Sequence, residues 1–150
     1  MSNNDIGDKK IINEIIVIFD KCEGDITNMN LSSLPFNKVE SIVVEFEKER
    51  IARHFFGEIN NVSYDIIELL GANYYKEHVH DYSNADFYFL KGDSSIISNG
   101  NKLHFNHHEK VHISAGTSHG FNVKEKTYFL SVQSPPIYNS EKDQYDIRLI

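Results

Sequence analysis

The sequence predicts an all-β protein, a sandwich or barrel of short antiparallel strands, preceded by a segment of a different kind. Three observations support this fold class. Short apolar runs recur from residue 41 onward, separated by Gly, Asn, Asp, Ser or Lys. The runs "SSIIS" and "KLHF" flank Asn99-Gly100, and the run "TYFLSVQS" stops at "SPP". Many short strands joined by polar turns are typical of sandwiches and barrels.

The first 40 residues form a separate N-terminal segment. The run "EIIVIF" fits a strand, but apolar side chains between residues 8 and 22 also recur at helical spacing, with Asp8 at the N-cap position. We therefore expect a helical or extended element, followed by a loop over residues 23–40. An apolar stretch of this kind is not stable free in water, so segment 1–40 should pack on the barrel or on a dimer partner. The helical pattern consists of Ile11, Ile12, Ile15, Ile16 and Phe19.

Residues 41–150 are expected to form a single β-barrel domain. Asn99-Gly100 predicts a two-residue hairpin, because both turn positions need positive φ. Pro135 and Pro136 should end the last long strand, since proline cannot donate to a ladder. "YDIRLI" is expected to supply one final strand at the C-terminus. The runs read as strands are "IVVEFE", "VSYDIIELL", "YYKEHVH", "DFYFL", "SSIIS", "KLHF", "KVHIS" and "TYFLSVQS".

Composition restricts the function classes. A chain of 150 residues is the usual size of one domain. Its net charge of −7, with no cluster of Lys and Arg, argues against a nucleic-acid partner. Cys22 is the only cysteine, so an internal disulfide is excluded. The first residues lack the apolar stretch of a signal peptide, and the run "IIVIF" is too short to span a bilayer. We therefore expect a cytoplasmic protein without a membrane partner.

Seven of the eight histidines lie between positions 78 and 119. His78 and His80, in "HVH", share one face of a strand, because side chains two residues apart point the same way. A third imidazole from a later hairpin would complete a facial set for a divalent metal, with positions left for water, substrate or oxygen. The alternative is that these are surface or aromatic-core histidines without a metal.

The remaining histidines of this region have less definite roles. His104 and His112 alternate with apolar residues in their strands, and fit equally well as interior groups near a metal or as outward-facing residues. His107 and His108 fall in the turn "NHHE" and are expected to face solvent.

Two stretches of the sequence resemble the two motifs of the cupin superfamily. In "HVH" followed by "ADFYFLKG", His78 and His80 match the histidine pair of the first motif, and Gly92 matches its closing glycine. In "SAGTSHGFN", Gly116 and His119 match the core of the second motif. The resemblance implies a cupin-type jelly-roll β-barrel. It also implies a site for a divalent transition metal (Fe, Zn, Ni or Mn) held by His78, His80 and His119.

The resemblance covers about residues 70–135, and the sequence departs from the pattern within them. Ala85 stands at the position of the first motif's glutamate and cannot bind a metal. Asp86 is next to it, but faces the opposite way unless a bulge in "DYSN" turns it inward as an additional ligand. Ser114 replaces the second motif's proline, and His108 its first glycine. Three neutral histidines leave the full 2+ charge on an ion, which suits an anionic substrate or a bound water.

Three functions remain open at this point. The first is a metal-dependent enzyme, a dioxygenase or a lyase/isomerase, acting on a small polar, sugar-like or acidic molecule. Some cupin dioxygenases use three histidines, so the resemblance keeps this chemistry open despite Ala85. The second is a small-ligand binding module without turnover, and the third is a structural or regulatory barrel with a vestigial pocket. Arg53 and Gln133 are candidates to anchor a substrate carboxylate or hydroxyl, by analogy of fold alone. Small barrels have strand edges to cover, so we expect a homodimer.

Overall fold

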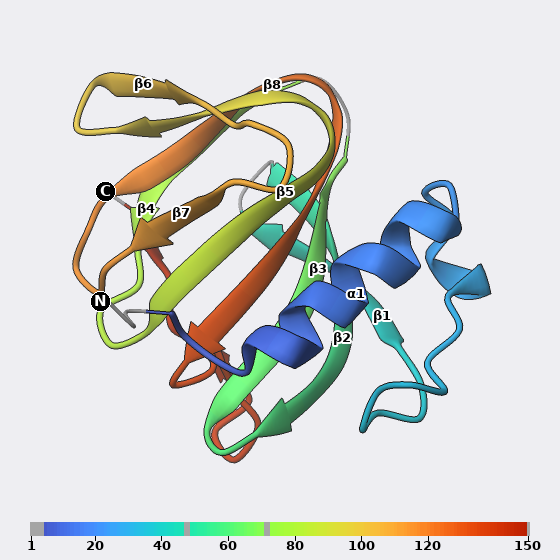
Figure 1. Ribbon diagram of the computed structural model, residues 1–150. Coiled ribbons are helices and arrows are strands. Elements are labelled where there is room, and N and C mark those ends of the chain that lie inside the picture. The colour runs from blue at the N-terminus through green and yellow to red at the C-terminus, as the bar shows by residue number, and fades with distance from the viewer. Residues whose placement is uncertain (1–4, 47–48, 71–72, 150) are drawn as a thin grey trace.

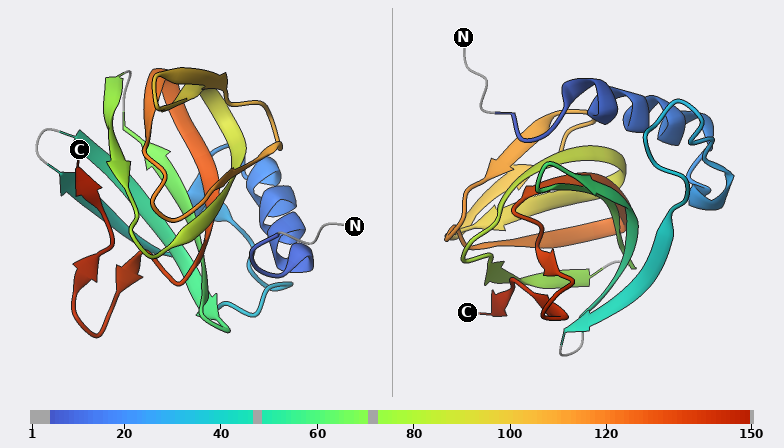
Figure 2. Two further views of the ribbon diagram at one scale, coloured as in Figure 1. Left: turned by 90° about the vertical axis from the view of Figure 1, so that its left-hand side faces the viewer. Right: turned by 90° about the horizontal axis from the view of Figure 1, so that it is seen from below.

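The chain folds into an antiparallel sheet that curls around on itself, with one helix against its outer face (Figures 1 and 2). This computed structural model describes residues 5–46, 49–70 and 73–149; the predicted segments extend beyond it at residues 1–4 and 150. Within the described part, nine strands form the main sheet and two short ones form a separate pair. The predicted all-β architecture is confirmed.

The N-terminal segment contains a helix, α1 (Lys9–Lys21), and then a single 3₁₀ turn, η1 (Ile26–Asn28). The helix begins after Asp8, whose Oδ1 accepts a hydrogen bond from the Lys10 backbone N–H at 2.8 Å. Of the two alternatives left by the sequence, the helical one is therefore confirmed. Among the described residues, no helix is long and apolar enough to cross a lipid bilayer.

The helix packs on the outer face of the sheet through one apolar stripe. Ile15 is fully buried, and Val17, on the opposite side of the helix, is 44% exposed. The stripe contacts side chains of the central strands, among them Tyr64 and Leu130. Burying the stripe is what holds a 13-residue helix in place, because isolated helices of this length are marginal in water. The stripe consists of Ile12, Ile15, Ile16, Ile18 and Phe19.

The sheet runs in the order β1-β2-β3-β8-β4-β11, and β5 pairs with β6, β7 and β8. Every pairing is antiparallel. The strands of the main sheet are β1 (Glu40–Phe46), β2 (Glu49–Ile59), β3 (Val62–Leu69), β4 (Asn73–Val79), β5 (Asn84–Ser98), β6 (Asn101–His104), β7 (Lys110–Ile113), β8 (His119–Ser134) and β11 (Arg148–Leu149). The separate pair is β9 (Tyr138–Asn139) with β10 (Gln144–Tyr145).

Strand β2 was not predicted from the sequence. Its segment "ERIARHFFGEI" mixes charged and apolar residues, and this obscures the alternation of a strand. Two of its charged or polar side chains are nevertheless buried, because neighbouring strand β3 supplies their partners. Arg53 pairs with Asp65 at 2.6 Å, and His54 lies 3.0 Å from Glu68. A strand of this kind is stabilised by contacts that its own sequence does not contain.

Strands β5 and β8 are each longer than predicted. The runs "DFYFL" and "SSIIS" were expected to be separate strands, yet β5 continues through both over 15 residues. Its register against β8 shifts between Phe89 and Ser94, around Gly92. Gly92 has φ of 117°, and a Cβ there would collide with the backbone of Lys126 and Thr127. The "LKGD" stretch therefore bends a continuous strand instead of ending it.

The predicted turns are confirmed. Ser98 pairs with Asn101 across a two-residue hairpin, in which Asn99 and Gly100 have φ of 51° and 79°. Strand β8 ends at Ser134, immediately before the two prolines. The C-terminal run "YDIRLI" supplies β11, which pairs with the end of β4.

Apolar side chains fill both faces of the central strands. On β8, Tyr128 and Leu130 point to the outer layer under α1, and Phe129 points to the interior of the barrel. The view from below in Figure 2 shows the helix outside the curled sheet. The interior layer contains Ile67, Leu69, Tyr75, Ala85, Phe87, Phe89, Ile96, Phe105, Ile113, Phe121, Val123 and Phe129.

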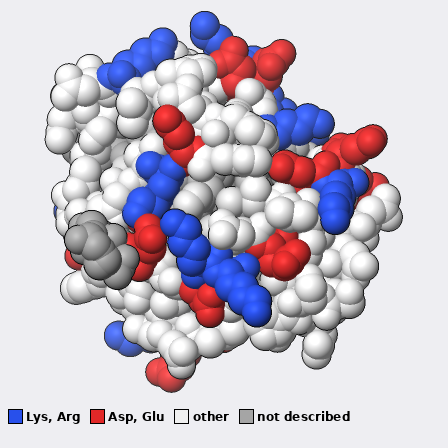
Figure 3. All heavy atoms as spheres, viewed as in Figure 1, with Lys and Arg blue, Asp and Glu red and all other residues white. Residues whose placement is uncertain are grey.

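Charges of both signs are interspersed on the face of the molecule that Figure 3 shows, without a patch of one sign. The edge strand β1 exposes Ile42 and Val43, each 50% accessible. The expected cytoplasmic location, the homodimer and the absence of a nucleic-acid partner remain predictions.

The packing of α1 predicts a sharp difference between two neighbouring positions of the helix. Ile15→Ala should lower the free energy of unfolding by about 2–5 kcal/mol, because it removes fully buried methyl groups from a packed layer. Val17→Ala, on the exposed side, should change it by about 0.5 kcal/mol or less. Urea denaturation of both variants measures the difference. Equal effects at the two positions would mean that the helix does not dock as described.

Candidate metal centre

Three histidines from two neighbouring strands meet inside the barrel. His78 on β4 pairs directly with His119, the first residue of β8, and His80 follows the end of β4. The ring centroids of His78 lie 4.3 Å from those of His119 and 5.1 Å from those of His80, and the third separation is 4.9 Å. One ring nitrogen from each lies within 4.8 Å of the other two. The structure thus brings together the three residues that the sequence singled out.

A glycine permits the close approach of β4 and β8 at this point. Gly120 follows His119, and a Cβ at Gly120 would collide with the carbonyl oxygen of Tyr75 and lie 2.9 Å from the backbone nitrogen of Glu77. Any larger residue would push β4 away from β8. The spacing between His78 and His119 therefore depends on this glycine.

Backbone carbonyls fix the protonation pattern of all three rings. His80 Nδ1 lies 2.6 Å from the carbonyl oxygen of Asp146, His119 Nδ1 lies 3.1 Å from that of Thr117, and His78 Nδ1 lies 3.2 Å from that of Lys76. A carbonyl oxygen only accepts, so each Nδ1 must carry the proton and donate it. In a neutral ring, Nε2 then keeps its lone pair. All three histidines consequently offer the same atom, Nε2, to a ligand.

The surroundings hold the three rings neutral. Burial lowers the pKa of His78 and lowers that of His119 well below its ordinary value. Burial, and then the proximity of His78, lower the pKa of His80 to about 4. His78 also disfavours a proton on His80 and on His119, because like charges at this distance repel. Neutral imidazole is the form that binds a metal.

This donor set fits a divalent transition metal. His119 is fully buried, and its Nε2 has no hydrogen-bond partner among the described residues. A buried ring nitrogen left unpaired costs free energy, and a metal ion would remove that cost. The carbonyl acceptors on Nδ1 are the kind of partner that orients histidine ligands in metal sites. Three imidazoles without a carboxylate suit Zn, Fe or Ni better than Mg or Ca.

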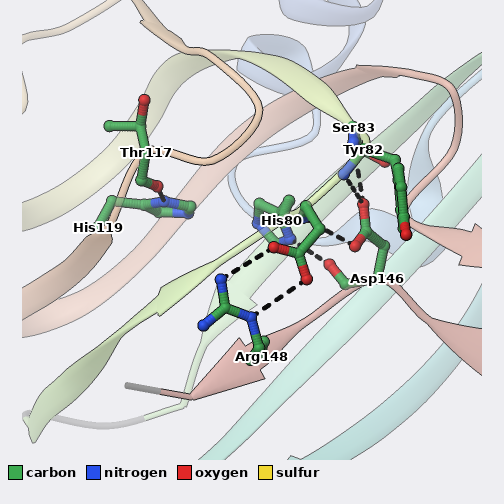
Figure 4. Close-up of polar contacts among 8 residues, drawn as sticks. His80, Tyr82, Ser83, Thr117, His119, Asp146 and Arg148 are labelled. Atoms are coloured by element: carbon green, nitrogen blue, oxygen red, sulfur yellow. Dashed lines mark hydrogen bonds and ion pairs between the residues drawn. The ribbon is translucent and has the colours of Figure 1, made fainter.

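The C-terminal strap, defined as residues 137–149, holds His80 in place (Figure 4). Asp146 provides the carbonyl that accepts from His80, and its carboxylate accepts from the backbone N–H groups of the turn after β4. Arg148 adds an ion pair with Asp81 at 2.9 Å. The sequence analysis missed Asp146, because it read "YDIRLI" only as a strand. The three donors to its carboxylate are the N–H groups of Asp81, Tyr82 and Ser83.

The histidines line an interior cavity of about 100 Å³. Its lining includes aromatic rings, among them Phe87 and Phe129. A second polar group faces the same cavity from β2, β3 and β8, and consists of Arg53, Asp65, Ser131 and Gln133. The strap covers the cavity with five side chains: Ile137, Tyr138, Tyr145, Ile147 and Leu149. Arg53 and Gln133, named from the sequence as substrate anchors, therefore line the same cavity as the histidines.

The position of the missing glutamate is also defined. Ala85 is fully buried in the interior layer, and Asp86, the next residue, points to the opposite face. Asp86 Oδ1 accepts a hydrogen bond from His112 Nδ1 at 2.6 Å, and its Oδ2 accepts from the Ile6 N–H at 2.9 Å. The pairing of β5 with β7 is regular here, so no bulge turns Asp86 inward. The structure does not bring Asp86 or His112 to the three histidines.

Three other histidines of this region lie at the surface. His104 is exposed on β6 and away from the interior cavity. His107 and His108 are exposed, as expected, and stack with ring centroids 3.7 Å apart. Together with Asp20 on α1 they form a second group whose ligand atoms lie within 4.8 Å. His108 Nε2 lies 3.2 Å from the Asp20 carboxylate, a contact that needs no metal. The interior site is therefore the stronger metal candidate.

Comparison with known proteins identifies the fold. No family model matches the chain, and no curated protein matches it by sequence. Three of the similar solved structures are Pac13, a nucleoside dehydratase from Streptomyces, KdgF from Halomonas sp. and a cupin-2 domain from Rhodospirillum rubrum. Pac13 superimposes with a TM-score of 0.58 at 13% identity, over 77% of this chain and 88% of Pac13.

The other two structures agree with this result. KdgF gives a TM-score of 0.53 at 15% identity, over 63% of this chain and 86% of KdgF. The cupin-2 domain gives 0.56 at 16% identity, over 64% of this chain and 69% of that domain. At such identities the likeness shows the fold alone. The chain has the cupin fold, and the cupin-type jelly-roll barrel expected from the two motifs is confirmed.

The lowered pKa of His80 predicts that the metal-free protein loses stability in acid. The folded pKa of about 4 lies below the unfolded value of 6.5, so the unfolded chain binds more protons between these limits. The stability from this residue is complete above pH 6.5 and is lost as the pH falls toward 4, an effect on the order of 3 kcal/mol.

Denaturant titrations of chelator-treated protein across this pH range measure the effect. His80→Asn should flatten the dependence of unfolding free energy on pH, and the exposed-site control His104→Asn should keep the wild-type slope. A slope unchanged in His80→Asn would contradict the assignment.

The role of the strap predicts that Asp146→Ala loosens His80. Losing the carboxylate frees three backbone donors and the turn that carries His80, and Zn²⁺ affinity should fall about 10–100-fold. Asp143→Asn is the matched control, since the contact of its carboxylate within the described residues is with the Tyr138 hydroxyl, and asparagine tolerates the φ of 50° at this position. Competition with a chromogenic chelator gives both affinities. Equal affinities for the two variants would remove Asp146 from the site.

Proposed function

We propose that this protein is a small metalloenzyme that binds a divalent transition metal at His78, His80 and His119 and acts on a small polar molecule. One observation carries the proposal. Three neutral imidazoles, His80 and His119 buried and His78 partly buried, have Nδ1 hydrogen-bonded to carbonyl groups and Nε2 available to a common ligand. A purely structural barrel has no need for this arrangement, because burying the unpaired Nε2 of His119 opposes folding.

A metal bound there would supply a Lewis acid that polarises a substrate oxygen or acidifies a bound water. The set of ligands is neutral, so the ion would keep its full charge and favour an anionic or acidic oxygen. Small acids, hydroxy acids and sugar-like molecules carry such oxygens. A cavity of about 100 Å³ is consistent with a small substrate of this kind.

We favour a lyase or isomerase over a dioxygenase, because the cavity offers a group for proton transfer. Glu49 lines the cavity, and its Oε1 accepts a hydrogen bond from the backbone N–H of Lys76, two residues before His78. A carboxylate in this position can take a proton from a carbon next to a polarised carbonyl. The likeness to Pac13 supports the same reaction class, since removal of water from a substrate needs such a proton transfer.

The alternative is a binding module without turnover. The aromatic side chains of the cavity lining and the absence of a carboxylate at Ala85 favour this function. Both functions use the same three ligands, so the metal is the first property to establish.

Replacing His78, His80 or His119 with Ala should weaken Zn²⁺ binding at least about a hundredfold, because two imidazoles hold a divalent ion poorly. The wild type should retain close to one ion per chain after dialysis, as measured by elemental analysis. His104→Ala is the control and should retain the wild-type content. His108→Ala separates any weaker binding at the surface group from the interior site. A wild type that retains no metal, or a His119→Ala variant that retains all of it, would refute the proposal.

A further inference from the structure

A second polar group in the cavity bears on the identity of the substrate. Arg53 on β2 and Asp65 on β3 form a buried ion pair, with Nε and Oδ2 2.6 Å apart. Both side chains line the cavity that contains the three histidines. Phe87 links the two regions, because its ring packs 5.8 Å from that of His119 and its backbone pairs with Ser131, which is also paired with Asp65.

Only one of the two oxygens of the Asp65 carboxylate, Oδ2, has hydrogen-bond partners among the described residues. Gln133 contacts Oδ2 at 3.5 Å through Nε2, which also donates to Ser131 at 2.8 Å. The Gln133 carbonyl is occupied as well, by Ser63 and by the Ile137 N–H. Oδ1 of Asp65 has no partner among the described residues, although the residue is 1% exposed. It is a buried acceptor without a donor.

The guanidinium of Arg53 is also fixed in position, and its Nη groups remain available as donors. Its centre lies 4.6 Å from the ring of Phe55 and 5.3 Å from that of Tyr138 in the strap. Nε donates to Asp65, and the Nη groups have no hydrogen-bond partner within the described part of the chain. A planar guanidinium clamped in this way offers its Nη donors with little further loss of entropy.

Charge decides what kind of group fits here. Burial raises the pKa of Asp65, and the adjacent Arg53 opposes that rise. A contact of 2.6 Å is that of an ion pair, so we take Asp65 as ionised and the pair as neutral overall. A substrate carboxylate would add an uncompensated negative charge next to Asp65. The sequence offered a carboxylate or a hydroxyl as the group that Arg53 would anchor, and the neutral pair, with donors and an acceptor side by side, favours the hydroxyl.

We propose that the Arg53–Asp65 pair binds a neutral hydroxyl or amide group of the substrate, whose other end carries the acidic oxygen that faces the histidines. This inference rests on the proposed function for the histidine end only. The carbonyl of an amide, or the oxygen of a hydroxyl, accepts from Arg53 Nη. The N–H or O–H of the same group donates to Asp65 Oδ1. The substrate class is therefore a small acid with a neutral polar group at its far end.

Three matched series of ligands test the proposal with Zn²⁺-loaded protein. The first contains the ω-amido acids succinamate, glutaramate and adipamate, the second the corresponding dicarboxylates, and the third the monocarboxylates that end in a methyl group. The lengths vary because the span of the cavity selects one of them. At the best length, isothermal titration should show the amide binding about tenfold more tightly than the dicarboxylate or the methyl analogue, because only the amide satisfies both partners.

Asp65→Asn should reverse this preference. The variant frees the positive charge of Arg53, so the dicarboxylate should gain at least about tenfold relative to the amide. Asp93→Asn is the matched control, because it removes a carboxylate from a strand residue outside the cavity, and it should keep the wild-type ratio. Metal content and melting temperature are recorded for each variant. If Asp65→Asn does not fold, the wild-type ratio alone decides.

Failure of this proposal is distinguishable from failure of the proposed function. If the wild type holds no metal, the same series is measured on the metal-free protein, where the ratio of amide to dicarboxylate remains the readout at weaker absolute affinity. A wild type that prefers the dicarboxylate, discriminates nothing or binds no member of any series overturns the assignment of Arg53 and Asp65, whatever the metal content.

Discussion

The pairing of β5 with β8 is the constraint on which the rest of the molecule depends. The two strands stay hydrogen-bonded from Asn84 opposite Ser134 to Ile97 opposite Gly120, and they bend together where Gly92 lets the backbones cross closely. Because side chains alternate along a strand, one face of this ribbon meets α1 and the other encloses the cavity. His119 stands at the beginning of β8 and Gln133 near its end, so a single strand contributes to both polar ends of the cavity.

The two ends differ in the charge that they offer. At the histidine end, the carbonyl groups of Lys76, Asp146 and Thr117 accept hydrogen bonds from Nδ1, and burial keeps the rings neutral. Any positive charge there would come from a metal. At the other end, opposite charges on Arg53 and Asp65 cancel. A molecule that spans both ends would therefore be selected for two groups. The histidine end would select an acidic oxygen, and the Arg53–Asp65 end would select a neutral donor–acceptor group. Orientation follows from this asymmetry, because the reversed pose would leave both ends unsatisfied.

Local patterns in the sequence predicted what local chemistry determines. The spacing of His78 and His80, the Asn99-Gly100 turn and the proline stop after β8 each depend on a few neighbouring residues, and each was predicted correctly. Features that depend on distant partners were not predicted. Strand β2 could not be recognised, because the partners that allow Arg53 and His54 to be buried lie on the next strand. Asp146 contacts His80 from 66 residues away and through its backbone carbonyl. Every residue has such a carbonyl, so the sequence does not indicate this contact.

The strap that covers the cavity is held less firmly than the strands of the barrel around it. It is attached to the barrel by the two residues of β11, by hydrogen bonds of Ile137 and Asp146, by side chains packed over the cavity and by one exposed ion pair. Strands β3, β5 and β8 are instead joined by long ladders of backbone hydrogen bonds. Sub-global opening of so few bonds costs far less free energy than unfolding of the sheet. We expect the residence time of a bound molecule to follow detachment of residues 137–149 more closely than global stability. Evolution could thus change the rate of exchange at residues 146–149 without altering the surfaces that contact the ligand from the barrel.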